Sequence, residues 1–236
     1  MSFRTVFKSR HVVLPVVHVL NISQAVRNAK LAMDAGADGV FLINHSVSPT
    51  QLLASWRAAV EATGAWVGLN VLGVHPKTLF SGPNFPKELA GVWVDNALIV
   101  EGDEQPDADR VREGQTLGGW APPQLYFGGV AFKYQTPVAW GKLGLMAKAA
   151  AAYVDVVTTS GTGTGSAPSP DKLRVMKEAI GDHPIAVASG ITPENVEHFL
   201  PFTDAFLVAT GISTSFVELD ADKTRALVDR VRAFAG

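Results

Sequence analysis

The sequence predicts an α/β protein that folds as a single (β/α)8 TIM barrel over residues 1–236, and three observations predict it. Eight short apolar runs alternate with helical stretches along the chain. Divided among eight units, 236 residues give about 30 residues per unit, which suits one strand and its crossover helix. Hydrophobic residues make up 47% of the chain and the formal net charge is -2, so one large core can be buried and a disordered chain is excluded.

The eight expected strands are nearly continuous apolar runs rather than alternating ones. This pattern is typical of parallel strands that are buried on both faces. In chain order, the runs are Val12 to Leu20, Gly39 to Ile43, Trp66 to Val71, Gly91 to Val94, Gln124 to Phe127, Val154 to Thr158, Ile185 to Ala188 and Ala205 to Val208.

The segments between the runs carry helix start and stop signals. Ser48-Pro49-Thr50-Gln51 supplies an N-cap residue, a proline for the first helical position and the glutamine of a capping box. Ser169-Pro170-Asp171 and Thr192-Pro193-Glu194 repeat this arrangement, so helices are expected after the sixth and seventh strands. Gly36 and Gly64 lie where the preceding helices should end.

An open, doubly wound sheet is the alternative architecture. Its first strand-to-helix turn would carry a glycine fingerprint, but Leu20-Asn21-Ile22-Ser23 contains no glycine. The glycines gather after the late strands instead, which favours the barrel. Asp38, Asp155 and Asp204 lie at the starts of three apolar runs, where turn or cap roles are expected.

Composition also excludes several kinds of chemistry and partner. Without cysteine there is no disulfide, no thiolate metal site and no cysteine nucleophile. The positively charged residues are scattered along the sequence and form no basic cluster, so nucleic acid is not expected as a main partner. The first apolar run contains Pro15 and His18 and is followed by no small-residue cleavage site, and no run approaches a membrane span. We therefore expect a cytoplasmic protein with no membrane insertion; whether it forms a homo-oligomer is left open.

Polar side chains follow the runs, where a barrel places its functional residues. The ring comprises His18, Asn44, His45, Asn70, His75, Asp95, Asn96, Lys133, Thr159, Ser160, Ser189 and Thr210. Any single member could be an ordinary hydrogen-bonded residue at a loop end, but together they favour a site. Within this ring, Asn44, His45, Asn70, Thr159 and Ser160 are the candidates for substrate binding.

The loops after the last three strands indicate phosphate binding. Glycine lets backbone N–H groups approach an anion, and barrels often bind phosphate with the loops after strands seven and eight. Tight turns explain each loop separately but not their coincidence. The run from Gly161 to Gly165 lacks the Gly-Lys-Ser/Thr ending of a P-loop. The candidate phosphate-binding residues are Gly161, Thr162, Gly163, Gly165, Ser189, Gly190, Thr210 and Gly211.

Asp95, His18 and Lys133 are the candidate catalytic residues. Asp95 directly follows a strand, and Trp93 and Trp66 are expected to form an apolar wall that raises its pKa. His18 could share the proton transfer, since imidazole titrates near neutral pH. Lys133 could form a Schiff base, but we expect it to contact the ligand by its charge.

A metal site is the weaker alternative, and we expect neither a metal nor another cofactor. Asp95 with Glu101 and Asp103 could hold Mg²⁺ together with a substrate phosphate. However, residues 101–109 resemble a solvated acidic loop. The histidines at 18, 45 and 75 lack the compact spacing of a zinc site.

Part of the sequence resembles known barrel families. Residues 189–196, Ser-Gly-Ile-Thr-Pro-Glu-Asn-Val, resemble the phosphate loop of the ribulose-phosphate-binding barrels, which include phosphoribosylanthranilate isomerase. More of the chain is similar to the BtpA/SgcQ family of barrels, named for a photosystem I biogenesis factor. The matching stretches are Pro15 to His18, Ala35 to Val40, Asn70 to Leu72, Ala152 to Asp155, Gly161 to Gly165 and Ser189 to Val196. This resemblance implies a (β/α)8 barrel with a phosphate site and supplies no reaction.

The chain departs from the isomerase at its catalytic positions. That enzyme uses a cysteine base after strand one and an aspartic acid after strand six. This chain has no cysteine, and Thr158 and Thr159 lie near the second position. A hydroxyl group cannot replace a carboxylic acid there, so we do not expect that isomerase reaction.

Two functions remain open at this point. The first is an enzyme that binds a phosphorylated small molecule, a sugar phosphate or phosphoribosyl compound, and catalyses acid/base isomerisation or group transfer. The second is a non-catalytic, BtpA-like binding or assembly factor that retains the phosphate site. The polar ring favours the enzyme, although a fold alone never proves an activity.

Overall fold

The computed structural model describes residues 2–82 and 86–234 and has eight parallel strands that close into a barrel. The strands are β1 (Val12–His18), β2 (Val40–Ile43), β3 (Val67–Asn70), β4 (Gly91–Val94), β5 (Leu125–Gly129), β6 (Val156–Thr159), β7 (Ile185–Ala188) and β8 (Ala205–Val208). Pairing of β8 with β1, Ala205 opposite Val12, closes the ring. The predicted TIM barrel is therefore confirmed, and the open sheet is excluded.

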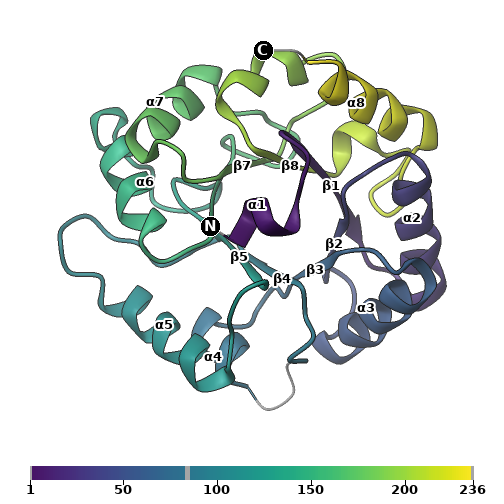
Figure 1. Cartoon of the computed structure of the whole chain (residues 1–236), viewed down its shortest axis with the longest axis horizontal. Helices are drawn as coiled ribbons and strands as arrows, with labels where there is room; N and C mark the ends of the chain where they lie inside the picture. The colour runs from purple at the N-terminus through teal and green to yellow at the C-terminus, as the bar shows by residue number, and fades with distance from the viewer. Residues whose placement is uncertain (1, 83–85, 235–236) are drawn as a thin grey trace.

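Seven helices form a layer around the barrel (Figure 1). They are α2 (Ile22–Asp34), α3 (Pro49–Thr63), α4 (Pro76–Ser81), α5 (Pro106–Gly118), α6 (Leu143–Ala151), α7 (Pro170–Ile180) and α8 (Ala221–Ala233). One apolar cluster fills the barrel interior, and a second lies between strands and helices. All the strands are buried along their whole length, as their continuous apolar sequences predict.

Two of the three predicted helix starts are confirmed. The Ser48 hydroxyl accepts a hydrogen bond from the N–H of Gln51, and the Ser48 N–H donates one to the side-chain oxygen of Gln51, so the capping box is complete. Ser169 caps α7 in the same way through the N–H of Lys172. Gly64 ends α3 in the left-handed conformation, as expected for a glycine at that position.

The third predicted helix start, at Thr192-Pro193-Glu194, is wrong. Two short 3-10 turns, Val196–His198 and Leu200–Phe202, connect β7 to β8 in place of an α-helix. Pro201 lies within the connection, where it would remove a helical hydrogen bond and clash with the preceding turn. The Asn195 side chain instead accepts from the N–H of Thr192 and donates to the carbonyl of Gly190.

A short helix that the sequence analysis did not predict, α1 (Ser2–Val6), lies across the amino end of the barrel (Figure 1). Phe3 and Phe7 are buried and belong to the interior cluster. Their rings contact Phe127 and Trp66, with centroids 6.4 Å and 5.1 Å apart. The helix therefore covers the end of the barrel opposite the carboxyl ends of the strands.

Candidate functional site

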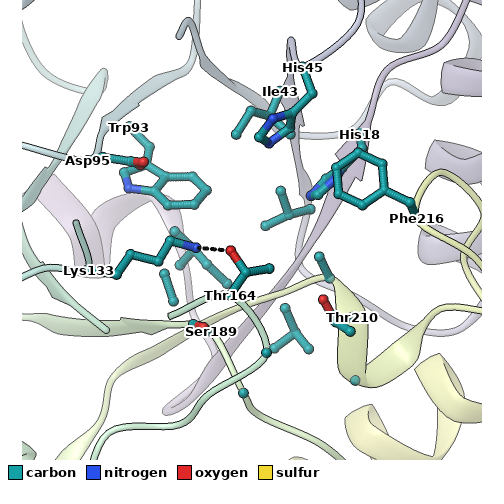
Figure 2. Close-up of a pocket in the computed structure, with 18 of the residues that line it drawn as sticks. His18, Ile43, His45, Trp93, Asp95, Lys133, Thr164, Ser189, Thr210 and Phe216 are labelled. Atoms are coloured by element: carbon teal, nitrogen blue, oxygen red, sulfur yellow. Dashed lines mark hydrogen bonds between the residues drawn. The ribbon is translucent and has the colours of Figure 1, made fainter. Parts of the chain in front are cut away.

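A cavity of about 280 Å³ opens at the carboxyl ends of the strands. Its polar lining residues come from both halves of the barrel, and apolar side chains form its floor. Figure 2 shows Asp95 and Lys133 on one side, His18, His45 and Phe216 on the other, and Ser189, Thr164 and Thr210 between them. The structure therefore brings all three predicted catalytic residues to one cavity.

Asp95 follows β4 and points its carboxyl group toward this cavity (Figure 2). Burial raises the pKa of Asp95, while a hydrogen bond from the Asn70 side chain (2.9 Å) and the positive charge of Lys133 oppose the rise. Trp93 lines the cavity, but Trp66 packs against Phe7 at the opposite end of the barrel. The predicted rise in pKa is thus found, and the predicted contribution of Trp66 is wrong.

His18 and His45 lie side by side in the cavity wall, with ring centroids 4.7 Å apart. The exposed ring of Phe216 packs edge-on against His18 at 4.1 Å. Burial, with smaller contributions from His45 and Lys133, lowers the pKa of His18 to about 4. His18 is therefore neutral at pH 7 rather than poised to titrate there. Its Nδ1 atom is buried and, within the described residues, has no hydrogen-bond partner.

Lys133 reaches the cavity from the loop after β5. Its ammonium group lies 3.5 Å from the hydroxyl of Thr164 and near the Phe132 ring (Figure 2). Its backbone N–H donates to the Ser160 hydroxyl at 2.8 Å, which fixes the loop against the one after β6. This placement fits a residue that meets an anionic ligand by charge.

The loops after β6, β7 and β8 meet on one side of the cavity. Gly165, Ser189, Gly190, Thr210 and Gly211 all line it. Among the residues that the structure describes, the N–H groups of Gly165 and Gly190 have no hydrogen-bond partner. Backbone N–H groups of this kind, together with the Lys133 ammonium, suit a phosphate.

Gly190 has a structural requirement of its own. Its φ angle is 69°, and a Cβ atom there would lie 1.9 Å from the backbone nitrogen of Ala167. The missing side chain thus makes room for the loop after β6, and a substitution at 190 would displace that loop instead of entering the cavity. Gly163 has no such neighbour within 4 Å.

Several predicted site residues lie outside this cavity. Asn44 is buried and binds the backbone of Leu72 through its amide group. The Thr159 hydroxyl donates to the carbonyl of Ala131. Asn70 reaches the site only through Asp95. Ser160, Gly161 and Thr162 line a neighbouring cavity, and Gly163 accepts a hydrogen bond from Ser189. Ligand contacts for these residues stay predictions.

Sequence reasoning missed three residues at or near the site. Thr164 lies between Gly163 and Gly165, and this position could have added it to the candidate phosphate-binding residues. Phe216 lies in the connection between β8 and α8 and carried no sequence signal, because only the folded chain brings this connection against His18 at the end of β1. The sequence marked Lys172 only as a helix residue, yet its ammonium group is partly buried and binds the carbonyl of Ser160 in the loop after β6.

The residues weighed for metal binding do not come together. His75 caps α4, and Glu101 forms an ion pair with Lys142. Within residues 2–82 and 86–234, no group of three His, Asp or Glu side chains could hold a metal ion. In the same ranges, no helix has the length and apolar character needed to cross a bilayer.

Comparison with protein families supports the predicted resemblance. The model of the BtpA family matches residues 130–233, somewhat less than half of the chain. This range contains the loops after β6, β7 and β8, on which the resemblance mainly rested. No curated protein sequence matches the chain significantly.

Solved structures with the same fold include several enzymes of phosphorylated compounds. Phosphoribosyl anthranilate isomerase from Thermus thermophilus is 19% identical, with a TM-score of 0.62 over 93% of this chain and 98% of that one. (S)-3-O-geranylgeranylglyceryl phosphate synthase from Thermoplasma acidophilum, in complex with sn-glycerol-1-phosphate, is 14% identical, with a TM-score of 0.70 over 99% and 97%. Orotidine 5'-monophosphate decarboxylase from Methanocaldococcus jannaschii is 13% identical, with a TM-score of 0.68 over 96% and 100%. At these identities the likeness concerns the fold.

Proposed function

We propose that the chain is an enzyme that binds a phosphorylated small molecule, a sugar phosphate or phosphoribosyl compound, and catalyses acid/base isomerisation or group transfer. The observation that carries this proposal is that one cavity brings together groups suited to an anion and a carboxyl group. Lys133 and the glycine-containing loops suit an anion, and Asp95 lies on the same side of the cavity as Lys133. The similar structures support the phosphate assignment, because their named substrates are phosphorylated compounds.

The proposed chemistry uses the surroundings of each group. Burial raises the pKa of Asp95, which makes its carboxyl group easier to protonate and suits it to take up and release a proton. Neutral His18 can donate or accept a hydrogen bond but does not supply a positive charge at pH 7. Lys133 stays at the anion side and counters the charge of the phosphate. Isomerisation and group transfer both fit this arrangement.

The match to the BtpA family favours a second candidate, a non-catalytic binding or assembly factor with the same phosphate site. Both candidates predict phosphate binding, and only the enzyme requires Asp95 for turnover. Binding and turnover must therefore be measured separately.

A charge added to the anion side tests the binding step. Thr164→Asp places a carboxylate beside Lys133 at an exposed position. Thr50→Asp makes the same change at the exposed start of α3, outside the cavity. For the wild-type chain and Thr50→Asp, a phosphorylated sugar at 100 times its Kd should stabilise the fold by about 2.7 kcal/mol.

The measurement is the ligand-induced shift in Tm, at roughly 2–4 °C per kcal/mol for a chain of this size. Inorganic phosphate and a panel of sugar phosphates serve as ligands. Thr164→Asp should lose the shift while remaining folded. An equal shift in Thr164→Asp and Thr50→Asp, or no shift in the wild-type chain, contradicts the proposal.

A further inference from the structure

A second cavity, of about 390 Å³, lies beside the first. It is enclosed by the loop after β5, the loop after β6 and the start of α7. Lys133 and Tyr134 line both cavities. The Tyr134 hydroxyl lies 3.2 Å from the hydroxyl of Thr164, so Lys133, Tyr134 and Thr164 together form the wall between the two spaces.

Lys172 brings a positive charge to the second cavity. Its ammonium group donates to the carbonyl oxygens of Ala131 (2.6 Å) and Ser160 (2.8 Å). An ammonium group has three N–H donors, so one remains without an acceptor among the described residues. Burial lowers the pKa of Lys172 to about 8, and the group is therefore still largely protonated at pH 7.

No carboxylate compensates this charge. Within residues 2–82 and 86–234, neither Asp nor Glu forms an ion pair with Lys172. Buried charges in proteins are ordinarily paired, because two carbonyl dipoles replace only part of the lost hydration. A partly buried ammonium group that lines a cavity and lacks a counter-charge suits an anionic ligand.

The backbone around Lys172 is held in an unusual shape. Ala131 and Tyr134 have φ angles of 47° and 61°, which residues other than glycine rarely adopt. The Ala131 carbonyl accepts hydrogen bonds from both Lys172 and Thr159, which together hold this conformation. Such conformations concentrate at ligand sites; here Tyr134 lines both cavities and Ala131 lines the second.

We propose that the second cavity binds a further anionic group of the ligand, a carboxylate or a second phosphate, against the ammonium group of Lys172. The inference rests on the proposed function, because the first phosphate occupies the first cavity. It narrows the substrate class to small molecules with two anionic groups, one on each side of the wall formed by Lys133, Tyr134 and Thr164.

Three matched probes test the inference by calorimetric titration of the whole chain: a pentose monophosphate, the pentose bisphosphate and a phosphorylated aldonic acid of the same length. The wild-type chain should bind one of the two doubly anionic probes at least about tenfold more tightly than the monophosphate, as a charge-assisted hydrogen bond provides. Lys172→Met should remove this advantage and leave the monophosphate affinity unchanged. Lys148→Met, on the exposed side of α6, should retain it.

Thr162→Asp is the second variant, because Lys172→Met removes a hydrogen-bond donor from two carbonyl groups and could unfold. Thr162 is exposed and lines only the second cavity, so the added carboxylate repels an anion there without removing a contact of the fold. It should also abolish the advantage of the doubly anionic probes. An advantage that is absent from the wild-type chain, or that survives in both folded variants, overturns the inference.

The two proposals fail in different ways. Normal monophosphate binding without any gain from a second anionic group refutes the inference and leaves the proposed function intact. Absence of monophosphate binding refutes the proposed function. Inorganic phosphate titrated into the wild-type chain and Thr162→Asp then tests the second cavity by itself, and equal binding by the two refutes it.

Discussion

Asp95 is the residue on which the catalytic proposal depends. Asp95→Asn retains the shape of the side chain and can still accept the hydrogen bond from Asn70, but it cannot exchange a proton. We expect the variant to remain folded, to keep ligand affinity and to lose turnover by about 10²-fold or more. The measurement is kcat and KM with a phosphorylated compound that the wild-type chain turns over.

Asp103→Asn serves as the matched control, since Asp103 is an exposed carboxylate outside the cavity. Unchanged kcat in Asp95→Asn would leave Asp95 with a structural role. This result would favour the second candidate function, a non-catalytic binding or assembly factor.

His18 should make the stability of the fold depend on pH. Its pKa in the folded chain is about 4, below the ordinary 6.5, because burial disfavours the charged ring. Between these values the unfolded chain binds a proton that the folded chain does not. The free energy of unfolding should therefore fall as the pH drops from 6.5 to 4, by about 1.4 kcal/mol per pH unit at most from this group.

Urea unfolding of the wild-type chain and His18→Asn at several pH values checks this expectation. The curve of the variant should be flatter between pH 6.5 and 4. His198→Asn, at an exposed position, should follow the wild-type curve. Parallel curves for wild-type and His18→Asn would show that His18 does not titrate as its burial indicates.

At the scale of elements, the sequence predicted the helix starts that depend on residues close together in the chain. The capping box at Ser48 and the cap at Ser169 form because their partners lie three residues away. The same signal failed at Thr192, because Pro201 and the Asn195 hydrogen bonds favour short turns. Helix α1 was not predicted, because five residues cannot form a stable helix by themselves. The side chains that stabilise it, Phe127 and Trp66, lie far away in the sequence.

The contact between α1 and the barrel interior gives a prediction for Phe3. The side chain is 1% exposed and packs against the ring of Phe127 inside the barrel. Phe3→Ala should lower the free energy of unfolding by about 3–5 kcal/mol through lost burial and a cavity. The phosphate-induced shift in Tm should persist, because α1 lies at the opposite end from the proposed site.

Leu117→Ala is the control, because Leu117 is 79% exposed on α5. Its free energy of unfolding should stay within about 0.5 kcal/mol of the wild-type value. If Phe3→Ala were equally mild in urea unfolding, α1 would only cover the barrel end without stabilising it.

At the scale of the whole molecule, the ring of polar residues was predictable because parallel strands all deliver their carboxyl ends to one mouth. That rule placed Asp95, His18 and Lys133 at one cavity. It could not separate them from Asn44 and Thr159, whose side chains turn to the backbone of adjacent loops. Strand order fixes which end a residue occupies, and only packing between neighbouring loops fixes where its side chain points.

The opposite end of the barrel explains the three aspartates that precede strands. Each of these aspartates accepts a hydrogen bond from a backbone N–H in the first two residues of a neighbouring strand. Val13 donates to Asp38, Tyr126 to Asp155 and Ile185 to Asp204. Their repetition therefore has a structural cause, since a closed ring of parallel strands presents the same unpaired N–H group at successive positions. The expected cap role of these residues is found.

Asp204 should contribute most to stability, because it connects three parts of the chain. Its buried carboxylate binds the N–H of Ile185 at 3.0 Å and the ammonium group of Lys177 at 2.7 Å, and it pairs with Arg4 beside α1. Asp204→Ala removes the side-chain acceptor of the Ile185 N–H and the counter-charge of Lys177 and Arg4. Allowing for the partial exposure of both cations, we expect a loss of about 2–3 kcal/mol in the free energy of unfolding.

Asp171→Ala provides the comparison, since its carboxylate is exposed and pairs with Arg174 one turn along α7. Its loss should be below about 1 kcal/mol, the usual scale of a surface ion pair. Urea midpoints of both variants measure the difference, and the phosphate-induced shift in Tm should be the same in both because neither residue lines the cavity. Equal losses would mean that water replaces the Asp204 carboxylate at the amino end, and that the contacts of α1 with the barrel rest on the phenylalanines alone.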